Sequence, residues 1–220
     1  LISHIMQINK KNGAWSFSGK VADKLEKHIQ RSVPNYLESH NMILNLADFF
    51  LFNGSTCYDL GSSTGNLLNK LSKQTNKSEL NLVGIEREVG MIKIAKKNKI
   101  KNNKIKTSFL KKDIKTYKLK SCNLVISFYT MQFIHPSHRQ KIFDKIFKAL
   151  NYGGALIIFE KIRGNDARFE NILSSLYADF KEKNRFKSKE ILNKSQSLRG
   201  VLEPFTDKGN LGFLKRSGFK

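Results

Sequence analysis

Long hydrophobic runs are missing from this sequence of 220 residues. No stretch approaches the roughly 20 apolar residues that a membrane-spanning helix needs, so we expect no membrane association. The first four residues lack an initiator methionine, and they also lack the charged and apolar regions of a signal peptide. We therefore expect a cytoplasmic protein whose printed sequence starts inside a longer reading frame.

Cysteine is equally scarce. The two cysteines, Cys57 and Cys122, both fall in predicted core strands. Neither has the spacing of a metal ligand, and buried reduced thiols are typical of a cytosolic protein. We expect no metal site.

Acidic residues are few compared with basic ones. The chain has 18 Asp and Glu against 40 Lys and Arg, a net charge of +22. Such an excess would suit a polyanion such as RNA. Most of it is lysine scattered along the chain, without the interleaved aromatics and arginines of a base-stacking platform. An RNA-binding surface and a merely solvated lysine-rich face therefore both remain open.

The alternation of predicted elements indicates the fold class. A hydrophobic content of 40% and sixteen phenylalanines indicate a globular protein, of a length that suits one domain. Apolar strands are predicted at 56–60, 80–85, 105–109, 124–128 and 155–159, with helices at 66–73, 89–99 and 138–150. This order is typical of a parallel sheet covered by helices on both faces. We predict a Rossmann-like α/β fold.

The same pattern divides the single domain, residues 1–220, into three parts. Residues 1–53 form a helical cap with helices at 21–30 and 42–52, and residues 54–160 form the nucleotide-binding core. Residues 161–220 hold C-terminal helices at 166–182, 188–198 and 208–216. The final helix leads into no further strand, so the strand at 155–159 would remain an exposed edge, which proteins avoid. We expect a natural protein longer by one hairpin, or a partner that covers this edge.

A glycine loop follows the first strand. It runs from Asp59 through Gly61 to Gly65, and the three-glycine dinucleotide fingerprint is absent because the loop reads Gly-Ser-Ser-Thr-Gly. Glycine lets a ligand approach the backbone closely, and the helix that follows presents free N–H groups. Taken alone, the loop fits a nucleotide site and a tight turn equally well.

Acidic residues follow the next two strands. Glu86 comes after the second strand and Asp113 after the third, and a polar-aromatic loop at 127–133 follows the fourth. The carboxyl ends of parallel strands meet at the edge where such sheets bind ligands. Glu86 is placed to accept hydrogen bonds from ribose hydroxyls, and Asp113 from the amine of adenine. Singly, Glu86 could be a surface acid beside Arg87, and Asp113 a turn residue; together they favour an adenosine site.

These motifs resemble a known family. Asp-Leu-Gly-x-x-x-Gly, followed by the acids at 86 and 113, is similar to class I S-adenosylmethionine-dependent methyltransferases. The segments 29–36, 129–134, 153–156 and Glu160-Lys161 resemble bacterial carboxy-S-adenosylmethionine synthases, over about residues 15–219. The resemblance implies binding of S-adenosylmethionine or its carboxylated derivative. Members of that family use prephenate to make the carboxylated sulfonium, which then serves wobble-uridine modification of tRNA.

The resemblance also implies site residues. The cofactor-binding residues would be Tyr36, Asp59, Gly61, Ser62, Ser63, Gly65, Glu86, Arg87, Asp113, Ile114 and Ser127. Glu86 stands where the family usually has Asp, and Ser127 where it has Asn. More importantly, Ser195 replaces the arginine that pairs with the extra carboxylate of the family's product. A serine cannot supply bidentate guanidinium recognition, so Arg199, one helical turn later, is the other substrate-binding candidate.

Three functions are compatible with a serine at position 195 in place of the family's arginine. The first is a methyltransferase that descends from the synthase lineage, and the second is a working synthase in which Arg199 or a partner-subunit residue replaces the arginine. The third is an RNA-binding module without catalysis. The sulfonium activates its own methyl group, so no general base is obligatory and no catalytic residue is assigned. His135 is the nearest candidate for a general base, and the alternative is a structural or solvent-facing histidine. The expected partners are a small-molecule or tRNA-pathway substrate, a second copy of the chain, and RNA.

Overall fold

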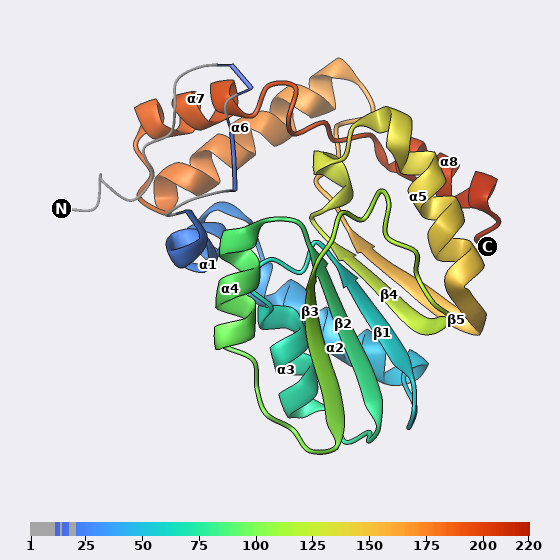
Figure 1. Cartoon of the computed structure of the whole chain (residues 1–220). Coiled ribbons are helices and arrows are strands. Elements are labelled where there is room, and N and C mark those ends of the chain that lie inside the picture. Colours follow the sequence, from blue (N-terminus) through green and yellow to red (C-terminus); the bar gives the residue numbers. More distant parts are fainter. Residues whose placement is uncertain (1–11, 14, 18–20) are drawn as a thin grey trace.

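The fold comes from a computed structural model that describes residues 12–13, 15–17 and 21–220 (Figure 1). Its strands are β1 (Thr56–Leu60), β2 (Leu80–Glu86), β3 (Ile105–Lys111), β4 (Cys122–Phe128) and β5 (Leu150–Phe159). Its helices are α1 (Val21–Ser32), α2 (Tyr36–Phe50), α3 (Asn66–Gln74), α4 (Val89–Lys97), the short 3-10 helix η1 (Met131–Phe133), α5 (Pro136–Ala149), α6 (Ala167–Lys183), α7 (Ser188–Ser197) and α8 (Asp207–Ser217). The predicted α/β order is confirmed.

The five strands form one parallel sheet in the order β3-β2-β1-β4-β5. The chain moves outward from β1 to β2 and β3, and then returns to the other side of β1 for β4. The strand order therefore reverses between β1 and β4, and this is where open α/β sheets bind ligands. Asp59 lies at this point, paired with Gly84 on one side and Ile126 on the other.

Neighbouring strand residues pack into two separate core layers, because successive side chains of a strand point to opposite faces. On one face, Cys57 packs in a cluster with residues of α2, α3 and α4. On the other, Tyr58 packs in a cluster with residues of α5 and α8. Both faces are covered, which explains the nearly continuous apolar character of β1, β2 and β4.

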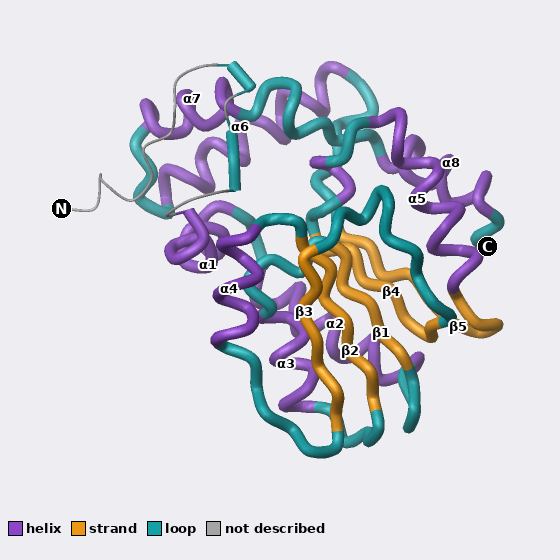
Figure 2. The backbone as a smooth tube through the Cα atoms, viewed as in Figure 1, coloured by secondary structure: helices purple, strands orange, loops and turns teal. Residues whose placement is uncertain are grey.

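Helices α1, α6 and α7, which we call the helical roof, lie over the carboxyl ends of the strands (Figures 1 and 2). The N-terminal and C-terminal parts of the roof are joined by hydrogen bonds. The Arg31 guanidinium donates to the carbonyl of Asn184 at 2.6 Å, and the Tyr177 hydroxyl donates to the carbonyl of Ser32 at 2.9 Å. Segments far apart in the sequence thus enclose one space above the sheet.

Two element boundaries differ from the sequence-based prediction by five residues or more. Helix α2 begins at Tyr36, because Asn35 takes a left-handed conformation (φ 53°) that restarts the helix directly after Pro34. Its apolar side packs against the sheet, so only α1 of the two N-terminal helices belongs to the roof. Strand β5 begins at Leu150, which pairs with Cys122 before the ladder shifts register toward Ala155.

Two apolar surfaces are left exposed. On α6, Phe169, Ile172, Leu173 and Leu176 recur at helical spacing and are all exposed, and this helix has no buried residue. Strand β5 is an edge of the sheet, as predicted. Within the described part of the chain, none of the helices has the length and apolar character required to cross a membrane.

We predict that Gly65→Ala destabilises the protein more than Gly54→Ala. Both glycines have a positive φ, 80° and 84°, but a Cβ on Gly65 would overlap the ring of Phe109, whereas nothing lies within 4 Å of one on Gly54. Backbone strain alone costs about 1 to 2 kcal/mol, and overpacking adds about 1 to 3 kcal/mol. Urea unfolding measures both free energies; equal losses in the two variants would contradict this packing.

Candidate functional site

A cavity of about 620 Å³ lies between the carboxyl ends of the strands and the helical roof. Nine of the predicted cofactor-binding residues line it, and they come from four separate segments of the chain. They are Tyr36, Asp59, Gly61, Ser62, Ser63, Glu86, Arg87, Asp113 and Ile114. Folding therefore brings the residues that the sequence singled out into one space.

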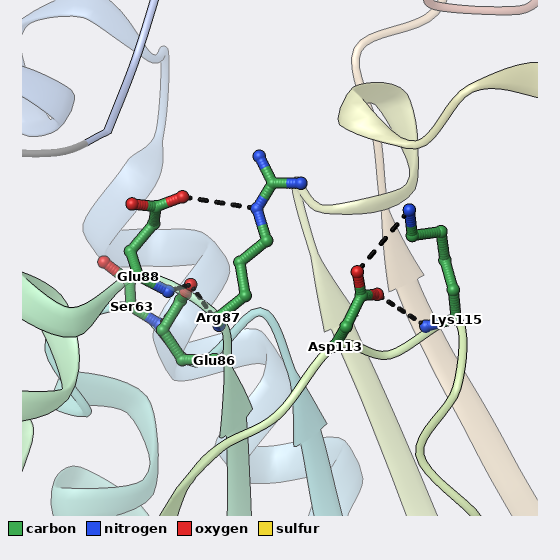
Figure 3. Close-up of polar contacts among 6 residues, drawn as sticks. All are labelled: Ser63, Glu86, Arg87, Glu88, Asp113 and Lys115. Atoms are coloured by element: carbon green, nitrogen blue, oxygen red, sulfur yellow. Dashed lines mark hydrogen bonds and ion pairs between the residues drawn. The ribbon is translucent and has the colours of Figure 1, made fainter.

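The carboxylate of Glu86 connects the glycine loop to the start of α4 (Figure 3). One oxygen accepts the N–H of Ser63 at 3.0 Å. The other accepts the N–H of Arg87 at 2.8 Å and that of Glu88 at 2.9 Å. Burial raises the pKa of Glu86, and these backbone N–H groups oppose the rise because they stabilise the charged form. The Arg87 side chain extends away to pair with Glu88 at 3.3 Å.

The glycine loop passes close to the loop that follows β4. Gly61 has a φ of 78°, and a Cβ at this position would overlap the side chain of Thr130. The N–H groups of Gly61 and Ser62 both point back to the carbonyl of Ile85, at 2.8 and 3.1 Å. Only a residue without a side chain fits here, because Thr130 packs directly against the backbone of Gly61.

Asp113 stabilises a turn and also lines the cavity. Its carboxylate accepts the N–H of Lys115 at 2.8 Å and forms an ion pair with the same lysine at 3.5 Å (Figure 3). It therefore closes a turn, and it also lines the cavity next to the buried Ile114. This pair offers an acceptor and an apolar surface side by side.

Tyr36 and Asp59 form the inner side of the cavity. The hydroxyl of Tyr36 donates to a carboxylate oxygen of Glu26 at 3.3 Å, and its ring packs on Phe128 with 5.4 Å between centroids. Burial raises the pKa of Tyr36. Asp59 is only 2% exposed, and burial, together with the charge of Glu86, raises its pKa to about 7.

Five candidate residues lie outside the cavity wall. Gly65 precedes α3 with a φ of 80°, and Ser127 is fully buried in β4, with no hydrogen-bond partner for its hydroxyl among the described residues. Ser195 and Arg199 are both exposed and do not line the cavity. His135 is exposed and accepts from Ser137 at the start of α5, a structural role.

The sequence reasoning missed several residues that line the cavity. Glu160 accepts the N–H groups of Met131 and Gln132, both at 2.8 Å, and burial raises its pKa to about 7. Lys194 and His28 meet in the roof, with 2.6 Å between the Nζ and Nε2 atoms. Glu160 belongs to the Glu160-Lys161 segment that resembles the family. His28 and Lys194 lie 166 positions apart in the sequence, so no local sequence pattern links them.

This arrangement fits S-adenosylmethionine. Gly61 lets the glycine loop lie at the cavity wall, Glu86 and Asp113 provide acceptors at the ends of adjacent strands, and Tyr36 adds an aromatic ring. A cavity of about 620 Å³ falls in the range of about 300–1,000 Å³ typical of small-molecule sites, and it leaves room for a small second substrate. Among the described residues, no group of three or more His, Cys, Asp or Glu is arranged to hold a metal ion.

Comparison with known proteins agrees with this fold and with S-adenosylmethionine as the ligand. Residues 51–211 match the family model of a methyltransferase domain. In fold, the chain resembles a Haloferax volcanii methyltransferase solved in complex with its Trm112 activator, with a TM-score of 0.60 and 15% identity over 90% of this chain and 74% of that one. The fold and the matched domain define a Rossmann-like, S-adenosylmethionine-dependent transferase, as predicted.

Two curated relatives narrow this class. The carboxy-S-adenosyl-L-methionine synthase of Staphylococcus epidermidis is 36% identical over 207 residues, 94% of this chain and 89% of that protein. The synthase of Campylobacter jejuni is 37% identical over 207 residues, 94% of this chain and 86% of that protein. The chain belongs to the carboxy-S-adenosyl-L-methionine synthase family, which confirms the resemblance seen in the sequence.

We predict that Asp59→Asn changes how stability depends on pH. The pKa of Asp59 is raised in the folded protein from 3.8 to about 7, so between about pH 4 and about pH 7 the folded state binds more protons than the unfolded state, and stability falls as pH rises. The amide lacks this dependence. The stability of the variant relative to the original protein should therefore rise with pH through this window and stay constant above it.

Urea unfolding at a series of pH values measures this difference. Asp179→Asn is the matched control, because Asp179 is an exposed carboxylate on α6. Parallel profiles for the original protein and Asp59→Asn would show that Asp59 ionises normally.

Proposed function

We propose that this protein is a carboxy-S-adenosylmethionine synthase that uses S-adenosylmethionine and prephenate, in the cytoplasm, for the pathway of tRNA wobble-uridine modification. The observation that supports it best is the makeup of the cavity. Asp59 lies in β1, Glu86 ends β2 and Asp113 follows β3, whereas Lys161, which follows Glu160, and Lys194 line the part formed by the end of β5 and the roof. A sulfonium nucleotide and an anionic acid need this pairing of charges.

The roles of the residues follow from their contacts. Glu86 would accept from the ribose hydroxyls, since its carboxylate lies beside the backbone of the glycine loop. Asp113 and Ile114 would hold adenine, and Tyr36 would pack against the ligand from the N-terminal side. The bound S-adenosylmethionine supplies a methyl group that its sulfonium acidifies and activates.

The proposed carboxylation of S-adenosylmethionine is balanced in atoms, charge and electrons. Prephenate loses one carboxyl group as CO₂ and its ring hydroxyl as hydroxide, and an aromatic keto acid remains. The sulfonium methyl gives up one proton and forms a C–C bond to that CO₂. The proton and the hydroxide make water, so no external oxidant or reductant is required.

Methyl transfer to an acceptor is the second candidate. Ser195 favours it, because this serine stands where the family has its carboxylate-binding arginine, and because neither Ser195 nor Arg199 lines the cavity. Association of two copies also remains a prediction, which the exposed apolar residues of α6 support and which the mass of the protein in solution tests.

Mass spectrometry of the nucleotide product tests the proposal. The purified protein is incubated with S-adenosylmethionine and prephenate, and we expect a sulfonium nucleotide heavier by one CO₂. Glu86→Ala should give none because it loses the ribose acceptor, whereas Glu38→Gln, an exposed acid on α2, should act like the original protein. Unchanged S-adenosylmethionine in the presence of prephenate would refute the synthase and leave methyl transfer.

A further inference from the structure

The cavity contains a cluster of cations that the residues assigned so far do not explain. Lys194, on α7, and Lys161, directly after β5, both line the cavity. Lys181, on α6, adds a third ammonium group. Lys161 and Lys181 lie over the same ring, that of Tyr177, at 5.2 and 3.7 Å from its centroid.

Within the described residues, no carboxylate forms an ion pair with Lys181 or Lys194, and Glu170 acts on Lys161 only from beyond ion-pair distance. The ion pairs there involve other lysines and Arg87. The Nζ of Lys194 instead meets the Nε2 of His28 at 2.6 Å. Burial and the charge of Lys194 lower the pKa of His28 to about 3, so this histidine is neutral and accepts a hydrogen bond from the ammonium group without cancelling its charge.

The positive charges act on one another. Burial and the charge of Lys181 lower the pKa of Lys194 to about 7, and burial and the charge of Lys161 lower that of Lys181 to about 8. Bringing three like charges together in a partly buried space without a paired counter-ion is unfavourable. A bound anion would remove this repulsion.

A second donor at the same place, the indole N–H of Trp15, has no acceptor within the described part of the chain. The ammonium of Lys194 lies 5.2 Å from the ring centroid of Trp15, which lines the same cavity. The indole N–H of Trp15 is buried and has no hydrogen-bond partner among the residues that the structure describes. Buried donors are almost always paired, so this N–H independently indicates that an acceptor from a ligand belongs here.

We propose that Lys194, with Trp15 and Lys161, binds a carboxylate group of the acid that reacts with S-adenosylmethionine. This inference rests on the proposed function and assigns the acid's anionic group to residues in this chain other than Ser195 and Arg199. Lys194 lies one position before Ser195 on α7, and it faces the cavity while Ser195 is exposed. An ammonium group and an indole N–H here take the place of a guanidinium fork.

Calorimetric titration of prephenate into the protein loaded with S-adenosylmethionine tests this assignment. Lys194→Met should weaken prephenate binding at least about tenfold, because a hydrogen bond to a charged group is lost. Trp15→Phe keeps an aromatic ring without the N–H and should weaken it by a smaller factor. Both variants should bind S-adenosylmethionine within about twofold of the original protein.

Two control variants test whether the positive charge of Lys194 inside the cavity causes the change in prephenate affinity. Lys189→Met removes an exposed lysine from the same helix and should leave both affinities unchanged. Lys194→Arg retains the positive charge and should recover part of the affinity, which a purely structural role of Lys194 would not predict.

The outcomes separate this inference from the proposed function. Binding of prephenate that depends on Lys194, without formation of the carboxylated sulfonium, would refute the synthase and support the subsite. Formation of the product, with equal prephenate affinity in Lys194→Met and the original protein, would refute the subsite and support the synthase. Equal weakening of prephenate and S-adenosylmethionine in Lys194→Met would also overturn the subsite, because it indicates a general disturbance of the cavity.

Discussion

The site depends on the carboxylate of Glu86 and the three backbone N–H groups that it accepts. These bonds fix the glycine loop after β1 relative to the first turn after β2, and so they set the shape of the cavity where the strand order reverses. Burial alone would favour the neutral acid, but backbone N–H groups aimed at the carboxylate favour its charged form. A single side chain at a strand end thus organises two loops and presents an acceptor toward the ligand.

The side of the cavity at the strand ends differs chemically from the side at the roof. The strand ends contribute Asp59, Glu86 and Asp113, and the roof contributes Lys194. The first side holds the residues that we propose to bind adenosine. The second side lies where the resemblance implies an arginine at position 195; this chain has Ser195 there, and the adjacent Lys194 lines the cavity.

Sequence reasoning predicted the sheet and its ligand edge because both depend on local patterns. Apolar strands mark β1 to β5, and the residue after each strand must fall at the same edge, so Glu86 and Asp113 were found. It missed Lys194 and His28 because their meeting depends on how α1 packs against the C-terminal helices. It also placed the starts of α2 and β5 too late, since a left-handed Asn35 and the pairing of Leu150 with Cys122 are tertiary features.

The most direct test of this account is a crystal structure of the protein with S-adenosylmethionine bound. We expect the ribose hydroxyls on the carboxylate of Glu86, adenine beside Asp113 and Ile114, and the sulfonium methyl facing the part of the cavity that Lys161 and Lys194 line. A nucleotide bound away from Glu86, or one whose sulfonium faces away from these lysines, would contradict the central claim that this cavity joins a sulfonium nucleotide to an acid.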